Sequence, residues 1–175
     1  MTSLHGERVQ LRHLAAGDLD TLWRWENRSE NWQYSSVPNY HSKDDLAQMV
    51  QEAPKDILET GQVRFIIEID SGVAIGTLDF FDFDPVHQRA GVGVLVAESQ
   101  YRQQGYAFEA MQLGLTFAFE QWALHQVYAQ VLENNLSSKR LFEKLGFVKA
   151  GVLKDWVNLE GNFVDQGLYQ KMKDG

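Results

Sequence analysis

The sequence predicts a mixed α/β protein with a largely antiparallel sheet. Short runs in which apolar and polar residues alternate, as in strands, recur along the chain, and between them lie segments whose apolar residues repeat every three or four positions, as in helices. Several of the expected strands follow one another through short turns, which favours antiparallel pairing. No repeat, low-complexity tract or linker divides the 175 residues, so we expect a single domain over residues 7–172.

The first half of the predicted order is a strand, two helices and a hairpin. In "RVQLRHL", apolar residues alternate with charged or polar neighbours, which indicates a strand. A short helix capped near Asp18 follows, and Ser42, with acidic residues directly after it, is a typical cap for a second helix. Residues 63–69 and 73–84 are two strands that the turn "DSG" joins into a hairpin.

The second half adds strands and two further helices. The run "RAGVGVLVAES" predicts a third antiparallel strand, and its interior Gly91 and Gly93 suggest either a bulge or a backbone that another group approaches closely. A helix follows Gly105, with an apolar stripe formed by Phe108, Met111, Leu115, Phe119 and Trp122. A strand "QVYAQVL", a helix that stops at Gly146 and a hairpin around "EGN" complete the order.

Composition narrows the class of function. Asp and Glu number 24 against 16 Lys and Arg, a net charge of −8 that repels nucleic acids and anionic membranes and favours a cationic partner. The chain has no cysteine, which excludes disulfides, thiolate metal sites and cysteine nucleophiles, and no metal site is expected. The first ten residues contain no apolar segment, and no run approaches the roughly 18 apolar residues of a membrane helix, so we expect a cytoplasmic protein.

The segment "RQQGYA" stands between the third expected strand of the hairpin region and the long helix. A glycine turn that leads into a helix leaves the first backbone N–H groups unpaired, and the helix dipole adds partial positive charge there. Gly105 permits close approach, Ala107 is small, and Arg102 can add a charge-assisted hydrogen bond. The turn therefore suits a phosphate group, although an ordinary strand-to-helix turn has the same pattern.

The same residues resemble a known family. Arg102, Gly105 and Ala107 match the R/Q-x-x-G-x-G/A motif with which the GNAT acetyltransferase superfamily holds the pyrophosphate of acetyl-CoA. The segment "RVQLRHLAAGDLDTLWRWENR" is similar to that family's first strand and helix, "ENNLSSKRLFEKLGF" to its second cofactor segment, and "EGNFVDQGLYQKM" to its closing hairpin. The resemblance covers about residues 7–171, and implies a sheet of about seven strands, splayed into a V between two central strands and flanked by about four helices.

The resemblance implies a site for acetyl-CoA, the acetyl donor. Its pantetheine arm would enter the V between the strand with Gly91 and Gly93, which the family fold bulges, and the strand "VYAQVL". The implied cofactor residues are Leu95, Val96 and Ala97 through their backbone groups, Arg102, the amides of Gln103, Gln104, Gly105, Tyr106 and Ala107, and Asn135 and Ser138 beside the pantetheine.

Two positions depart from the family pattern. Phe142 stands where many members have a tyrosine that protonates the departing thiolate, and Gly91 where many have a glutamate base. Another residue or a water relay therefore moves the proton, or the protein binds acetyl-CoA without rapid turnover. A backbone N–H near Leu95 or Val96 is the candidate for stabilising the oxyanion.

Asp82 is the candidate catalytic residue, as a base or as the anchor of a cationic amine. It shares a strand with Asp79, but three positions separate the two, so at most one of them faces the cleft. Asp82 is preferred because it lies nearer the strand end, and a solvated surface carboxylate is the alternative. His87, in the next turn, is a second candidate for proton relay, and His125 is expected at a structural junction.

Aromatic residues in "WRWENRSENWQY" suggest where the acceptor binds, because this region forms one wall of the acceptor site in relatives. We expect Trp25, Trp32 and Tyr34, together with Asp82, to contact the acceptor. Aromatic faces and nearby carboxylates suit an alkylamine. The alternative is that at least one of Trp23 and Trp25 belongs to the core.

These features predict an acetyl-CoA-dependent N-acetyltransferase that acts on a primary amine, of a protein N-terminus or a small molecule, by direct attack in a ternary complex. The branch it resembles contains ribosomal-protein alanine acetyltransferases and polyamine acetyltransferases. The negative charge and the turn "DPVHQRAG" make spermidine or spermine the second candidate acceptor. A non-catalytic acyl-CoA sensor is the alternative of another class, and a homodimer is an option because relatives are often dimers.

Overall fold

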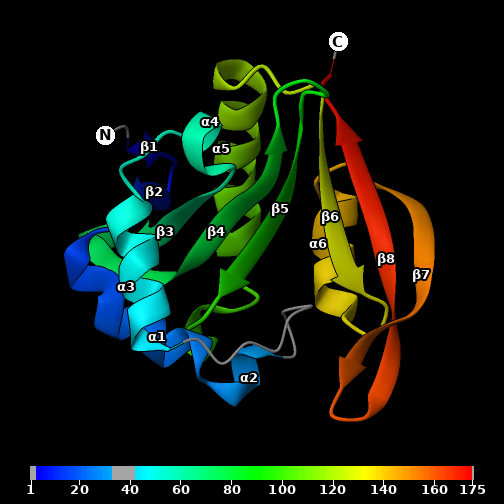
Figure 1. Ribbon diagram of the computed structural model, residues 1–175, viewed down its shortest axis with the longest axis horizontal. Coiled ribbons are helices and arrows are strands. Elements are labelled where there is room, and N and C mark those ends of the chain that lie inside the picture. The colour runs from blue at the N-terminus through cyan, green and yellow to red at the C-terminus, as the bar shows by residue number, and fades with distance from the viewer. Residues whose placement is uncertain (1–2, 33–41, 175) are drawn as a thin grey trace.

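The strands form one mixed sheet in a computed structural model that describes residues 3–32, 42–174 of the chain (Figure 1). Its order is β1-β2-β3-β4-β5-β6-β8-β7. The strands are β1 (Leu4–His5), β2 (Val9–His13), β3 (Val63–Ile69), β4 (Val73–Asp84), β5 (Arg89–Val96), β6 (Gln126–Leu132), β7 (Val148–Leu159) and β8 (Asn162–Met172). Neighbouring strands are antiparallel except β5 and β6, which are parallel, so the predicted fold class is confirmed.

Six α-helices lie in the described ranges: α1 (Leu19–Glu26), α2 (Ser29–Trp32), α3 (Lys43–Glu52), α4 (Ile57–Thr60), α5 (Tyr106–Gln121) and α6 (Leu136–Lys144). Ser42 caps α3 as expected: its hydroxyl accepts from the Asp45 N–H at 3.1 Å. The structure has one strand and two helices more than expected. The additional elements are short, since β1 has two residues and α2 and α4 have four each, too few for a periodic pattern in the sequence.

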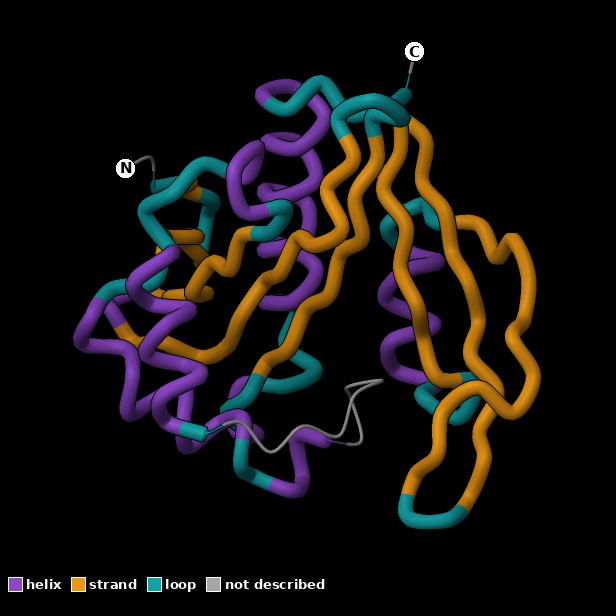
Figure 2. The backbone as a smooth tube through the Cα atoms, in the orientation of Figure 1, coloured by secondary structure: helices purple, strands orange, loops and turns teal. Residues whose placement is uncertain are grey.

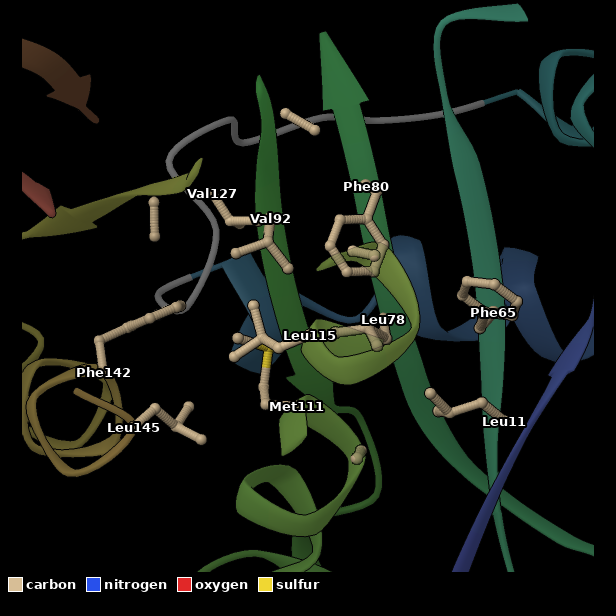
Figure 3. Close-up of a cluster of buried hydrophobic side chains, with 14 of the residues drawn as sticks. Leu11, Phe65, Leu78, Phe80, Val92, Met111, Leu115, Val127, Phe142 and Leu145 are labelled. Carbon is tan, nitrogen blue, oxygen red and sulfur yellow. The ribbon is translucent and has the colours of Figure 1, made fainter. Parts of the chain in front are cut away.

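Two hydrophobic clusters cover the two faces of the sheet. On one face, α5 and α6 pack against the central strands, and Figure 3 shows Leu78, Val92, Met111, Leu115, Phe142 and Leu145 in this cluster. On the other face, α1 and α3 bury Leu22, Trp25 and Leu46 against Ile66 of β3. None of the helices in the described part of the chain combines the length and the hydrophobicity that a membrane span needs.

The expected V lies between β5 and β6. Their parallel pairing covers only three residue pairs and ends at Gly91 and Tyr128. Beyond this point β6 keeps its pairing with β8 along its whole length, while β5 stays with β4, so the two strands separate (Figures 1 and 2). The splay leaves an unpaired edge on β5 within the sheet.

The bulge expected on β5 is not there. The register between β4 and β5 is unbroken along Gly91 and Gly93, and the irregularity falls on β4, between Phe81 and Asp84. The second reading of the glycines is correct for Gly91, because a Cβ at this position would lie 2.3 Å from the Phe81 ring. Gly91 is therefore a site of close approach by an aromatic side chain.

Candidate active site

A pocket of about 320 Å³ opens where the end of β5, the start of α5 and the first turns of α6 meet. Eight of the eleven residues expected to hold the cofactor line this pocket: Leu95, Val96, Arg102, Gln103, Gly105, Tyr106, Ala107 and Ser138. The other described residues of the wall are Val94, Tyr101, Phe108, Ser137, Leu141 and Lys144. The structure therefore brings the turn around Gly105 and the helix that contains Ser138, which are far apart in the sequence, into one pocket.

The turn before α5 has the geometry that an anion site needs. Gly105 precedes the helix with φ +85°, a left-handed conformation that favours glycine. The N–H groups of Tyr106, Ala107 and Phe108, in the first turn, have no carbonyl partner within the helix. These amides and the helix dipole present positive charge to the pocket, so a phosphate group fits here.

The charge of the pocket wall supports the same conclusion. Among the described residues, the wall includes two cations, Arg102 and Lys144, and no carboxylate, although the whole chain carries a net charge of −8. The ammonium of Lys144 lies 4.4 Å from the centre of the Phe108 ring, at the first turn of α5. A negatively charged ligand is therefore favoured in this pocket over other parts of the surface.

The backbone of β5 meets the open V through one of the three expected residues, Val96, and through Val94, which was not expected. The N–H of Ala97 donates to the carbonyl of Ile75 at 2.8 Å, so it is already paired with the start of β4. In an antiparallel pair the bonded residues alternate, which turns the groups of Leu95 toward β4 as well and those of Val94 and Val96 toward the V. Val94 was missed because register cannot be read from a single strand's sequence.

Arg102 lines the pocket but is also held by protein oxygens. Its Nε donates to the Val96 carbonyl at 2.8 Å, and its Nη2 donates to the Ala97 carbonyl at 3.3 Å and to Oδ1 of Asn31. The guanidinium thus ties the end of β5 to α2. To bind a phosphate directly, as expected from the sequence, Arg102 would have to share its N–H groups between the phosphate and these oxygens.

Besides Ala97, two of the expected cofactor residues lie outside the described pocket wall. Asn135 is the N-cap of α6, and its Oδ1 accepts from the N–H of Ser138 at 3.2 Å. The Gln104 side chain donates to the backbone carbonyl of Gln100, while the backbone carbonyl of Gln104 accepts from Arg8 at 3.0 Å. Both residues shape the turns from which other groups face the pocket.

Asp82 lies where β5 and β6 meet, at the closed end of the V. It belongs to the β4 irregularity, with φ +49°, and its Oδ2 accepts a hydrogen bond from the Tyr128 hydroxyl at 3.0 Å. Burial raises the pKa of Tyr128 to about 12, together with the hydrogen bond that Tyr128 donates to Asp82 and the negative charge of Asp82, against an opposing effect of Arg89. Tyr128 was missed because 46 positions separate it from Asp82.

Asp79 is ion-paired, and His87 and His125 lie in the connections between secondary-structure elements. Arg64 binds both carboxylate oxygens of Asp79, at 2.5 and 2.9 Å, so Asp79 is paired. The His87 side chain is exposed in the β4–β5 turn, and His125 lies at the junction between α5 and β6, as expected. Phe142 is 4% exposed and packs edge-on against Phe147, so this position contributes an apolar ring to the core.

The acceptor wall differs from the expectation at Trp25. Its side chain is 1% exposed, and its Nε1 donates to Glu98 at 2.7 Å, so Trp25 belongs to the core and cannot contact an acceptor. Trp23, one position earlier, is 40% exposed. Trp32 is half-buried, and its Nε1 donates to the Glu26 carbonyl at 2.7 Å. Tyr34 lies outside the described residues.

A smaller hollow of about 150 Å³ lies between α3, α4 and the facing ends of β3 and β4. Arg64, Asp79 and Phe81 form part of its wall, and Glu26 binds Arg64 at 2.6 Å. Burial alone would lower the pKa of Arg64, but the two carboxylates raise it, so the guanidinium stays charged. The charges of Glu26 and Asp79 are thus partly neutralised by Arg64.

Comparisons with known proteins agree with this geometry. The family model for the acetyltransferase (GNAT) domain matches residues 8–148. The N-acetyltransferase YoaA of Bacillus subtilis, whose name marks it as uncharacterized, is 28% identical over 171 residues, which are 97% of this chain and 96% of that protein. The spermidine N(1)-acetyltransferase of Vibrio cholerae is 25% identical over 158 residues, 90% of this chain and 89% of that protein.

Solved structures have the same fold. The spermidine N-acetyltransferase from Vibrio cholerae, in complex with CoA and spermine, superposes with a TM-score of 0.87 at 22% identity, over 95% of this chain and 96% of the other. The ribosomal-protein-S5-alanine acetyltransferase from Vibrio fischeri also gives 0.87, at 21% identity, over 99% and 98%. The chain therefore belongs to the GNAT acetyltransferase family. It is an N-acetyltransferase, and acetyl-CoA is its acetyl donor.

Proposed function

We propose that the protein transfers an acetyl group to a primary amine, of a protein N-terminus or a small molecule, by direct attack while donor and acceptor are bound together. One observation carries the proposal. The V between β5 and β6 has an anion-binding turn at its open end and a carboxylate, Asp82, at its closed end. A phosphate-bearing donor and a cationic acceptor can therefore approach the same point from different directions.

Different residues bind the donor and the acceptor. Acetyl-CoA, when bound, supplies the acetyl group as an activated thioester. The amides of Tyr106 and Ala107 hold its pyrophosphate, and the backbone groups of Val94 and the N–H of Val96 pair with its arm as a missing strand would, while Arg102 holds the Val96 carbonyl. Asp82 binds the ammonium of the acceptor and takes one of its protons, which leaves a neutral amine as nucleophile. Alignment of the two substrates supplies much of the remaining rate.

Spermidine or spermine is the second candidate acceptor. It is supported by the net charge of −8, by the exposed carboxylate of Asp82 and by the relative at 25% identity whose name specifies spermidine. The burial of Trp25 removes one aromatic contact that had favoured such an acceptor. A cytoplasmic location and a homodimer remain part of the proposal.

A panel of polyamines and N-terminal peptides tests the proposal through acceptor-dependent release of the CoA thiol. We expect saturable turnover with at least one amine, lowered about 100-fold in Asp82→Asn because a positioned base contributes on the order of 10² or more. Tight acetyl-CoA binding with no acceptor-dependent thiol release across the panel would instead favour the sensor alternative and contradict the proposed transfer.

A further inference from the structure

Four residues on three neighbouring strands form a continuous chain of contacts at the closed end of the V. Gly91 of β5 leaves room for the ring of Phe81, since a Cβ there would lie 2.3 Å from it. The Phe81 ring packs edge-on against the Tyr128 ring, with centres 6.2 Å apart and planes at 86°. The Tyr128 hydroxyl then donates to Asp82 at 3.0 Å. Gly91 thus makes room for the ring of Phe81, and this ring packs against the tyrosine whose hydroxyl bonds to Asp82.

The backbone at Asp82 does not by itself fix its carboxylate. The residue is exposed and lies in the β4 irregularity with φ +49°, outside the register of β4 with β5, so the described strands do not hold it through regular pairing. The bond from Tyr128 is its one side-chain hydrogen bond within the described part of the chain. This bond uses Oδ2 and leaves Oδ1 available at the meeting point of β5 and β6.

We propose that Tyr128 is a positioning residue for acetyl transfer, whose hydroxyl holds the Asp82 carboxylate so that Oδ1 meets the ammonium of the acceptor. The inference rests on the proposed function. In the step itself, an N–H bond of the ammonium breaks, its electron pair stays on nitrogen, and the proton bonds to Oδ1. The proton then passes to solvent, which returns Asp82 to its ionised form.

The environment of Tyr128 favours a donor that keeps its proton. Its pKa of about 12 lies well above neutral pH, so the phenol remains protonated and hydrogen-bonded while Asp82 changes its charge. The charged groups nearby are Asp82 itself and Arg89, which pairs with Asp84 at 3.4 Å. The carboxylate of Asp82 therefore lies on β4, next to Gly91 of β5, whereas many members of the family have a glutamate at the position of Gly91 itself.

A double-mutant cycle tests the positioning role. Tyr128→Phe should lower kcat about 10-fold and leave the KM for acetyl-CoA unchanged, because Tyr128 does not line the cofactor pocket. In the Asp82→Asn background the same change should have almost no further effect, since the hydroxyl acts through the carboxylate. The control is Tyr169→Phe, which removes a buried hydroxyl that has no partner among the described residues and should leave kcat unchanged. Multiplicative losses in the double variant would overturn the proposal.

A spectroscopic titration tests the contact independently of activity. Tyrosinate absorbance is followed to about pH 11, where a phenol with a pKa of about 12 is still about nine-tenths protonated, so the readout is the ionised fraction at that pH; circular dichroism confirms the fold, and the difference from Tyr128→Phe isolates this tyrosine. In Asp82→Asn the pKa of Tyr128 should fall, because the carboxylate no longer stabilises the protonated phenol. An unchanged titration would overturn the contact. If wild type acetylates no amine while this titration shifts as expected, the proposed function fails and the contact stands.

Discussion

Arg102, at the cofactor turn, donates a hydrogen bond to the buried side-chain oxygen of Asn31, 71 positions earlier in the chain. The Nδ2 of Asn31 donates in turn to the Trp25 carbonyl at 3.0 Å, and Arg102 also holds the Val96 carbonyl. One amide therefore joins α1 and α2 to the end of β5. The helices expected to border the acceptor and the strand expected to border the cofactor cannot shift independently.

Replacing Asn31 by Ala should weaken both stability and cofactor binding. The change deprives the Trp25 carbonyl and the guanidinium of Arg102 of one partner each, in a site where Asn31 is 2% exposed. We expect the free energy of unfolding to fall by about 1–3 kcal/mol and the Kd for acetyl-CoA to rise several-fold. Urea unfolding and calorimetry measure the two effects. Asn162→Ala, at an exposed hairpin position, is the matched control, and equal behaviour of the two variants would contradict the link.

Local signals in the sequence predicted most elements of the fold. The cap at Ser42 and the stop at Gly146, which has φ +85°, mark real helix ends because capping depends on a few adjacent residues. The short helix α4 was missed although it carries the same kind of signal. Asp56 caps it through the Leu58 N–H at 2.9 Å, and Gly61 ends it in the left-handed region.

Contacts between distant positions could not be predicted in this way. In α1 the aromatic pattern allowed either Trp23 or Trp25 to be buried, and the choice depends on Glu98, 73 positions away from Trp25. The link between Asp82 and Tyr128 likewise depends on the order of strands and on a register shift in β4. The cofactor turn was easier to locate because its anion-binding groups are consecutive along the chain.

Lys144 should contribute to the affinity for acetyl-CoA through its charge. It is the cation of the pocket wall that packs over Phe108 rather than bonding to a backbone carbonyl. We expect Lys144→Ala to raise the Kd about three- to tenfold at low salt, with a smaller difference at high salt because ions screen an exposed charge. Lys154→Ala, on the exposed final hairpin, removes the same charge far from the pocket and should not change the Kd. Equal effects of the two variants would mean that only net charge matters.

Installing a tyrosine at position 142 should not improve the enzyme. The Phe142 ring is 4% exposed and packs against Phe147, so a hydroxyl added there enters an apolar cluster. We expect Phe142→Tyr to lower the free energy of unfolding by about 1–3 kcal/mol without raising kcat. Phe163→Tyr, at a position that is 62% exposed, should be neutral in urea unfolding. A gain in kcat for Phe142→Tyr would show that protonation of the thiolate limits the reaction.

Acid should destabilise the fold through Asp18. Burial alone would raise the pKa of Asp18, but hydrogen bonds from Arg12 and from the Ala15 N–H, and the charge of Arg12, lower it below its ordinary value. The folded state therefore binds fewer protons than the unfolded state, and the stabilisation is present above about pH 4 and is lost as the pH falls through the lowered pKa. Thermal melts between about pH 2 and 7 should show a shallower acid loss in Asp18→Asn than in wild type. The control Asp174→Asn changes a carboxylate that is 95% exposed and should keep the wild-type profile.

Gly105→Val should abolish cofactor affinity while the fold remains. Gly105 has φ +85°, and a Cβ there would lie 3.0 Å from Nη2 of Arg8, so a β-branched residue strains the turn whose amides face the pocket. The left-handed conformation costs a non-glycine residue about 1–2 kcal/mol, which a domain of ordinary stability survives.

Gly161→Val supplies the matched control for this strain. Gly161 has φ +91°, no atom of the described residues lies within 4 Å of its added Cβ, and the position is at the tip of the β7–β8 hairpin, away from the pocket. Both variants should therefore lose similar stability in thermal unfolding, whereas only Gly105→Val should show no heat with acetyl-CoA in calorimetry. Wild-type affinity in Gly105→Val would mean that the diphosphate does not dock at the start of α5, and the assignment of the pocket would fail with it.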